Sequence, residues 1–303
     1  MPRSFNPENF GRNNNEGQPW PGEQKKLFEA ASPRAGELLA KERISPDDFK
    51  NFYSTRVIEG DEAEVKKRQK KHREISTPEQ EEMRQCAMVF EAIIHDMIDM
   101  NGWLGDNATA KKASLYDDLV NGIDEIVEFM EPDTSATTHL ALGVDITFGT
   151  DVINKLDKIK DQIEKGDLGV IKYLLTDTYR GEMKNVPKAV IGCDMKNLNE
   201  ITKFWLEGKK KVLAQHRAKF MILDQIMMQL NNFAQYAEKV SQPVIAGGFN
   251  RVLKIVEKIW DEELVKLPGG EKDLSFSGDR VYNTIREYCE ELNKENLQTP
   301  VKK

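Results

Sequence analysis

The chain has 303 residues, a formal net charge of −7 and 39% hydrophobic residues, which predicts a polar-surfaced globular protein of one large or two modest domains. No apolar run approaches the ~20 residues that a membrane-spanning helix needs, so no membrane partner is expected. The first 24 residues hold no apolar segment typical of a secretory signal. The negative charge argues against a protein that coats nucleic acid, although a local basic groove stays compatible with it.

The three cysteines lie far apart in apolar or amphipathic stretches, and no CxxC pair occurs. This pattern argues against a disulfide framework or a zinc site and favours reduced, buried thiols. We therefore expect a cytoplasmic protein.

Four segments follow one another along the chain. Residues 1–24 are rich in Asn, Gly and Pro and predict a disordered tail, and residues 25–76 predict a helical extension. The basic run within "EAEVKKRQKKHRE" is interpreted either as a solvated helix face or as an arm that contacts phosphates. Residues 77–197 predict a mixed α/β core, and residues 198–303 predict a mostly helical C-terminal region.

The core is expected to open with a helix over residues 77–102. Thr77 is its predicted N-cap, Pro78 occupies the first turn, and Gln80 stands three residues after the cap. An apolar stripe follows at helical spacing, with Glu91 at its edge.

The apolar period then changes from that of a helix to that of strands. Residues 123–129 ("IDEIVEF") and 139–147 ("HLALGVDIT") predict two strands, and a helix is expected over 150–166. Residues 169–176 and 188–194 predict two further short strands. The fold class predicted is α/β (α+β), with a small mixed sheet flanked by helices.

Two aspartates interrupt the apolar strands and define the candidate site. Side chains alternate along a strand, so Asp124 and Asp145 can converge on one side of the sheet if their strands are neighbours. A helix packed nearby could bring Glu91 to the same place. Clustered carboxylates persist when a cation compensates them, and Mg²⁺ or Mn²⁺ suits oxygen ligands best.

These residues resemble the motifs of the PD-(D/E)XK nuclease superfamily over roughly residues 80–195. The matching positions are Glu91 in "MVFEAII", Gly122 and Asp124 in "VNGIDEIVEF", and Asp145 in "LGVDIT". The resemblance implies a restriction-endonuclease-like core in which Asp124 and Asp145 bind the metal and Glu91 assists. It also implies a nucleic-acid substrate, DNA or RNA.

The chain departs from this pattern at the lysine that the family places two residues after the second acid, where Thr147 stands. The candidates for a displaced lysine are Lys155, Lys160 and Lys172. Asp117 and Asp118 in "LYDDL" are interpreted as turn or capping residues, with one of them open as a further ligand.

Two functions from different classes remain open. The first is a metal-dependent nuclease or a degenerate relative that has lost catalysis. The alternative is a non-enzymatic interaction protein that uses the C-terminal helices as its partner surface. No P-loop, GxGxxG in a strand–helix context or GxSxG occurs. The pattern does not predict an oligomeric state.

Overall fold

The computed structural model describes residues 22–74, 77–130, 137–145, 150–177, 179–267 and 274–298. Most of the predicted tail, and Thr147, therefore lie outside the described residues. The helices are α1 (Gly22–Glu42), the 3₁₀ helix η2 (Pro46–Phe49), α2 (Thr55–Glu74), α3 (Pro78–Asn101), α4 (Leu115–Asn121), α5 (Thr150–Lys165), α6 (Met195–Leu206), α7 (Lys210–Ala214), α8 (Arg217–Lys239), α9 (Pro243–Val265) and α10 (Arg280–Gln298). The strands are β1 (Ala108–Lys112), β2 (Glu125–Met130), β3 (Thr137–Asp145), β4 (Gly169–Leu175), β5 (Arg180–Val186) and β6 (Lys188–Gly192).

Within the described residues, four strands form one mixed sheet in the order β1-β2-β3-β6. The first three pair antiparallel and β6 pairs parallel with β3. The helix α3 precedes these antiparallel strands and α5 follows them, while β4 and β5 form a separate hairpin between α5 and β6. The predicted α/β class, with its mixed sheet and helical C-terminal part, is confirmed.

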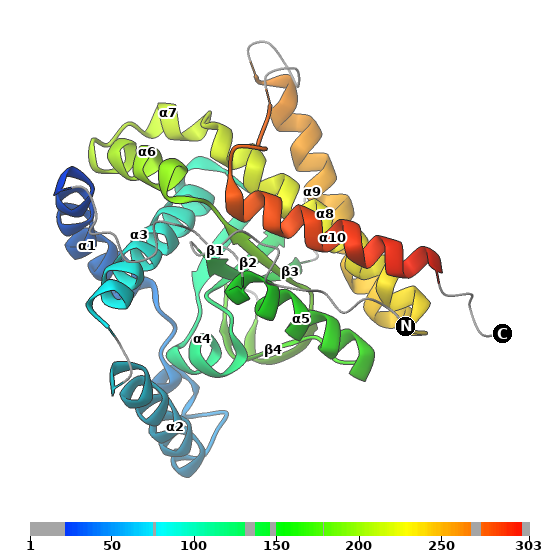
Figure 1. Ribbon diagram of the computed structural model, residues 1–303. Helices are drawn as coiled ribbons and strands as arrows, with labels where there is room; N and C mark the ends of the chain where they lie inside the picture. The colour runs from blue at the N-terminus through cyan, green and yellow to red at the C-terminus, as the bar shows by residue number, and fades with distance from the viewer. Residues whose placement is uncertain are drawn as a thin grey trace.

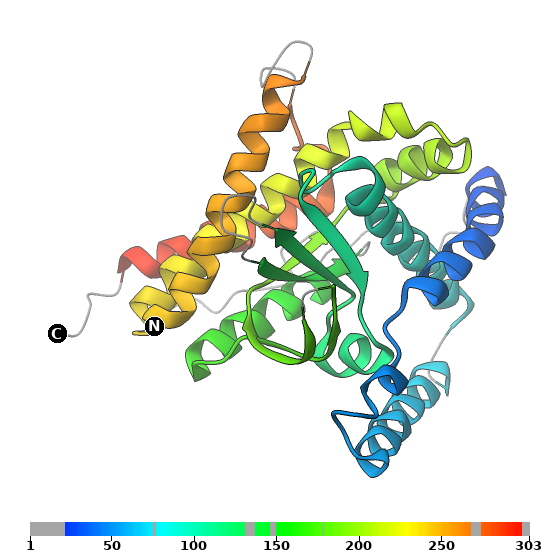
Figure 2. The ribbon, with the colours of Figure 1, turned by 180° about the vertical axis from the view of Figure 1, so that it is seen from behind.

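Both faces of the sheet are covered by other elements. Side chains alternate between the two faces along a strand, and consecutive residues of β2 and of β3 are buried. On one face Val127, Leu140 and Leu142 join a large apolar cluster with residues of α3, α8 and α9. On the other face Ile126 and Ala141 join a smaller cluster with residues of η2 and β4. The first face is therefore shared by α3 from the N-terminal part and by α8 and α9 from the C-terminal part, which lie toward opposite sides of the molecule in Figures 1 and 2.

Helix α8 also supplies hydrogen bonds to the edge strand β6. Gln229 accepts from the backbone N–H of Val190 at 2.8 Å and donates to its carbonyl at 2.7 Å. Gln225 makes the same pair of bonds to Gly192, at 2.9 and 2.8 Å. These amides satisfy buried backbone groups that no other described strand pairs, so the C-terminal helices complete the edge of the sheet.

The described part of the chain contains no helix that is both long and apolar enough to cross a membrane. The predicted division at residues 197 and 198 falls inside α6, which runs from Met195 to Leu206. The division into domains stays a prediction.

Candidate metal centre

Glu91 is presented by α3, whose start forms as the sequence predicts. The Thr77 hydroxyl accepts from the backbone N–H of Gln80 at 3.3 Å, and the Gln80 side chain accepts from the backbone N–H of Thr77 at 3.0 Å. The apolar side chains of α3 are buried against the sheet, and Glu91 lies at their edge with 15% of its side chain exposed. The Oε1 atom of this carboxylate is buried.

The other two carboxylates come from the tight connection between α4 and β2. Asp118 lies on α4, and Asp124 comes immediately before β2. Between them Gly122 ends α4 with a φ of 62°, a left-handed conformation that glycine adopts without steric cost. A Cβ at this position would also lie 3.1 Å from the Lys188 ammonium, so a larger residue would disturb the turn that presents Asp124.

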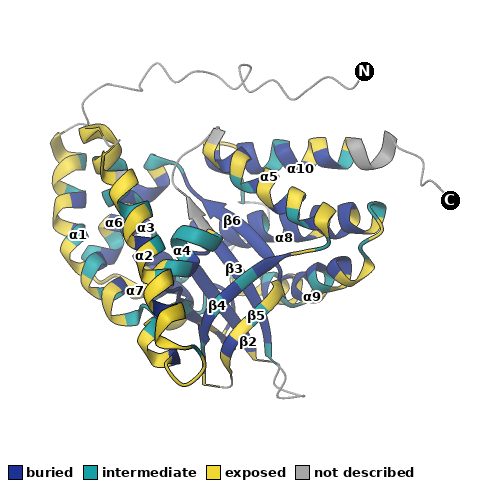
Figure 3. Ribbon diagram, turned by 90° about the horizontal axis from the view of Figure 1, so that it is seen from below, coloured by how far each residue is buried: buried dark blue, intermediate teal, exposed yellow. Residues whose placement is uncertain are grey.

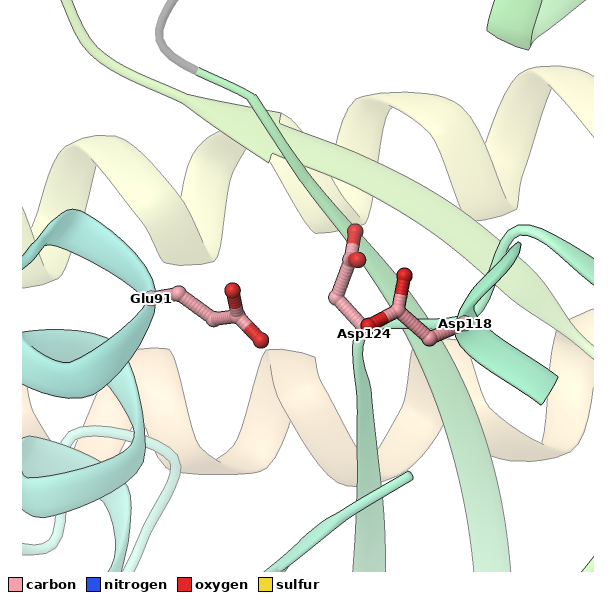
Figure 4. Close-up of side chains that lie close together, drawn as sticks. All are labelled: Glu91, Asp118 and Asp124. Carbon is pink, nitrogen blue, oxygen red and sulfur yellow. The ribbon is translucent and has the colours of Figure 1, made fainter. Parts of the chain in front are cut away.

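The side chains of Glu91, Asp118 and Asp124 point toward one another from α3, α4 and the start of β2 (Figure 4). One carboxylate oxygen from each lies within 4.8 Å of the others. We call these three residues the acidic triad. Three carboxylates at this separation repel one another unless cations or protons compensate them.

The cations that compensate the triad belong to the chain itself. The Lys112 ammonium at the end of β1 contacts Glu91, donates to the Asp124 carbonyl and lies 4.0 Å from Asp118. The Lys112 side chain is fully buried. Arg43 contacts Asp118 at 3.0 Å and donates to the Ala113 carbonyl at 3.1 Å.

A second buried lysine lies beside the α4–β2 turn. The Lys188 ammonium, from the start of β6, donates to the Asn121 carbonyl at 3.0 Å. Burial lowers the pKa of Lys188 to about 8, because the nearby charge of Asp124 only partly offsets desolvation and the repulsion of Lys155 and Lys158. The turn is thus bounded by positive groups on both the β1 and the β6 sides.

The electrostatics of the triad favour bound protons or cations. Burial raises the pKa of Glu91 to about 7, with Asp124 and Asp118 adding to the rise and Lys112 opposing it. Burial and Asp124 likewise raise the pKa of Asp118, against the pull of Lys112 and Arg43. Burial would lower the pKa of Lys112, but the neighbouring carboxylates outweigh it and the pKa is raised, so the ammonium stays charged.

The raised pKa of Glu91 predicts a pH-dependent stability in the absence of added metal. The folded protein binds the Glu91 proton more tightly than the unfolded chain, whose reference pKa is 4.5. The contribution of this tighter proton binding to the free energy of unfolding is fully present below about pH 4.5 and is lost as the pH rises through about 7. In urea unfolding with a chelator present, the free energy of unfolding should fall over this range by on the order of 1–3 kcal/mol.

Glu91→Gln should flatten that pH dependence, because glutamine binds no proton. Glu81→Gln, on the exposed first turn of the same helix, is the matched control and should behave like the wild type. An unchanged slope in Glu91→Gln would contradict the assignment of the raised pKa to this residue.

The structure brings together two of the three carboxylates that the sequence singles out, Glu91 and Asp124. Asp145 ends β3, where its backbone pairs in register with Gly192. Its side chain lies outside the described residues, so its role as a ligand stays a prediction.

Two of the three candidate lysines, Lys155 and Lys160, lie on α5, and Lys172 lies on β4. Lys155 acts electrostatically on Lys188, and the Lys160 ammonium lies 5.2 Å from the centre of the Tyr236 ring. Lys172 pairs with Asp61 at 2.5 Å. Its ammonium also lies 4.9–5.7 Å from the ring centres of three tyrosines, Tyr53, Tyr116 and Tyr173. Lys112, which the sequence motifs do not indicate, contacts the triad, and the roles of Lys155, Lys160 and Lys172 stay predictions.

Comparison of the chain with family models, with curated proteins and with solved structures gave no match. What bears on function is therefore the fold and the site: an α/β protein with a partly exposed acidic triad and an associated buried lysine. Such a triad could hold a divalent ion.

Proposed function

We propose that the protein is a metal-dependent nuclease that hydrolyses phosphodiester bonds in DNA or RNA, with Glu91, Asp118 and Asp124 as its metal ligands. The observation that carries the proposal is the convergence of three carboxylate oxygens within 4.8 Å beside a buried lysine. The order of α3, three antiparallel strands, α5 and β6 supports it, because this is the order expected from the resemblance to the PD-(D/E)XK superfamily.

The donor atoms and the charge of the site suit Mg²⁺ or Mn²⁺. All three ligands would be carboxylate oxygens, the donors that these hard cations prefer. With the triad fully ionised, its three negative charges lie beside Lys112 and Arg43, and Lys188 is close enough to interact electrostatically with Asp124. A bound ion of this kind would polarise the phosphoryl group and lower the pKa of a bound water.

The chain's own residues would position the substrate and stabilise the negative charge on its phosphoryl group. Glu91 and Asp118 keep 15% and 21% of their side chains exposed, so the triad lies near the surface. The Lys112 ammonium lies where it could stabilise negative charge on a phosphoryl oxygen, the role that the resemblance gives to its missing lysine. Lys112 therefore joins Lys155, Lys160 and Lys172 as a candidate for this role, and Asp145 remains a candidate fourth ligand.

The test is cleavage of DNA and RNA by purified protein with Mg²⁺ or Mn²⁺, compared with a chelator. Asp124→Asn and Glu91→Gln should each lower kcat by more than about 100-fold, because even groups that only support a ligand typically cost 10–100-fold. Asp261→Asn on the exposed face of α9 is the control and should retain activity. Absence of cleavage, together with no cation bound to the wild type in calorimetry, would refute the proposal.

One observation favours the alternative of a non-enzymatic interaction protein. Glu91 pairs with Lys112 and Asp118 pairs with Arg43, as expected for carboxylates that serve only the fold. In that case the helical C-terminal part would be the partner surface. Calorimetry separates the two functions, since a structural set of ion pairs would bind neither Mg²⁺ nor Mn²⁺ at the triad.

The cysteines support the predicted cellular setting. Cys86, Cys193 and Cys289 are free and buried. Free thiols are typical of reducing compartments, so a cytoplasmic location forms part of the proposal.

A further inference from the structure

Helix α2 carries a concentrated positive charge in an acidic protein. Residues 66–73 ("KKRQKKHR") contain six Lys or Arg and no Asp or Glu, whereas the whole chain has a net charge of −7. The exposed residues of this stretch are Lys66, Lys67, Lys70, Lys71 and Arg73. We call these five residues the basic face of α2.

Core packing does not account for this helix. Of the α2 side chains that the structure describes, Ile58 and Val65 are buried, and most of the others are exposed. Figure 3 shows α2 mostly in the colour of exposed residues, next to α4. A helix that is polar nearly all round is stabilised by its own charge pairs three and four residues apart, and α2 has four of them among its described side chains.

Specific contacts nevertheless hold α2 beside the helix that carries Asp118. Arg68 donates to the Leu119 carbonyl of α4 at 2.8 Å, next in sequence to Asp118. Asp61 accepts from the Tyr173 hydroxyl and pairs with Lys172, both at 2.5 Å. The basic face is therefore fixed relative to α4 and the adjacent triad.

The lysines of the basic face have only loose internal partners. Lys66, Lys67 and Lys70 lie 3.7 Å from glutamates of their own helix, and their side chains are 76%, 81% and 77% exposed. Exposed pairs of this kind contribute little to stability. The ammonium groups can therefore exchange these partners for phosphates at little cost.

We propose that the basic face of α2 binds the phosphodiester backbone of nucleic acid on the solvent side of the helix, opposite the Arg68 contact with α4, and so retains near the acidic triad the strand that the triad would cleave. Repeated phosphates match a row of exposed lysines on a rigid helix, and binding gains free energy from released counterions. Backbone contacts of this kind position the strand without reading its sequence. The binding surface stands on the charge and exposure of α2, while the retention of the strand near the triad rests on the proposed nuclease function.

The test compares two variants with the same change in charge. The first replaces Lys66, Lys67, Lys70 and Lys71 by Gln. The control replaces Lys203, Lys209, Lys210 and Lys211, which are exposed on and beside α6 and α7, by the same residue. Binding to a DNA duplex, to single-stranded DNA and to RNA is measured by fluorescence anisotropy in chelator at several salt concentrations, with circular dichroism to verify that α2 stays folded.

The α2 variant is expected to bind nucleic acid at least about tenfold more weakly at low salt. The slope of the logarithm of its binding constant against the logarithm of the salt concentration should be smaller in magnitude by roughly 0.7–0.9 for each phosphate that the variant no longer neutralises. The control should remain within about twofold of the wild type. Equal weakening in both variants, or no nucleic-acid binding by the wild type, would overturn the inference. So would weaker binding to phosphatidylserine vesicles in the α2 variant with nucleic-acid binding unchanged.

Activity assays separate this inference from the proposed function. If the wild type cleaves nucleic acid, the α2 variant should cleave it poorly yet hydrolyse the small diester bis(p-nitrophenyl) phosphate as the wild type does. Normal cleavage of long nucleic acid by that variant would overturn the inference and leave the nuclease function intact. If nothing is cleaved but the α2 variant alone binds nucleic acid weakly, the binding surface stands and the nuclease function falls.

Discussion

Replacing Lys112 by methionine is expected to lower the free energy of unfolding by about 3–5 kcal/mol near neutral pH, the usual cost of removing one partner of a buried ion pair. The Lys112 side chain is fully buried, and its ammonium contacts Glu91 and the carbonyl of Asp124. Methionine keeps most of the apolar stem but removes the charge. The carboxylate of Glu91 would then lack its main compensating cation.

The destabilisation should depend on pH and on divalent cations. Lys112 lowers the pKa of Glu91 in the wild type, so in the variant this pKa should lie above about 7. The destabilisation should therefore shrink as the pH falls toward 7, because a proton on Glu91 then replaces part of the missing charge. Mg²⁺ or Mn²⁺ should restore part of the stability if the triad binds a cation as proposed. Urea unfolding with and without cation, at several pH values, measures both effects.

Lys111→Met provides the matched control on the same strand. Lys111 precedes Lys112 on β1, so its side chain points to the opposite face, and it is only half-buried. We expect this variant to be destabilised by less than about 1 kcal/mol, as is usual for substitutions of surface charges. Equal destabilisation at the two positions would show that Lys112 does not compensate the triad.

The strands that could be predicted from the sequence are those formed by apolar runs. β2, β3, β4 and β6 match predicted segments, because buried strands of this kind stand out by period and composition. β1 ("ATAKK") and β5 ("RGEMKNV") are not predicted, since both are rich in polar residues. Their pairing is set by β2 and β4, and that tertiary context is absent from a local pattern.

The same limit explains what could be predicted of the site. Glu91 and Asp124 could be identified because each interrupts an apolar pattern with a definite face. Asp118 lies in the first turn of a short helix, where acids are common as capping residues, so its sequence context favours a local role. Lys112 ends the unpredicted β1, and its alignment with Glu91 depends on how α3 packs on the sheet. Lys172 lies within the strand β4, where a charged side chain is unexpected. It is accommodated there by its ion pair with Asp61 and by the surrounding tyrosine rings.

Replacing Asp117 by alanine is expected to lower the free energy of unfolding by about 3–5 kcal/mol and to weaken metal binding at the neighbouring triad. Asp117 is fully buried and accepts from the backbone N–H groups of Lys172 and Tyr173 at 2.8 and 3.1 Å. Its carboxylate also accepts from Ser114 and Asn121 of the α4 segment, at 2.8 and 2.7 Å. Each buried donor left without a partner costs about 1–3 kcal/mol.

The two backbone donors depend on Asp117 because the hairpin is irregular. The β4–β5 register shifts between Ile171 and Leu174, so Asp117 serves backbone groups at the shift. Asp117 thereby ties α4 to β4 and orients the helix that presents Asp118. We expect Asp117→Ala to weaken Mg²⁺ or Mn²⁺ binding by about 10–100-fold in calorimetry, as is usual for groups that orient a ligand.

Two further variants serve as controls, the conservative change Asp117→Asn at the same position and Asp151→Ala on another helix. Asparagine keeps one carbonyl oxygen for the β4 donors, so its cost should lie between those of the wild type and alanine. Asp151 is an exposed acid in the first turn of α5, and its removal should cost less than about 1 kcal/mol. Hydrogen exchange at the Lys172 and Tyr173 amides gives the local readout. If those amides exchange as slowly in Asp117→Ala as in the wild type, Asp117 does not hold α4 on β4, and the position of Asp118 must be set by Arg43 and Lys112 alone.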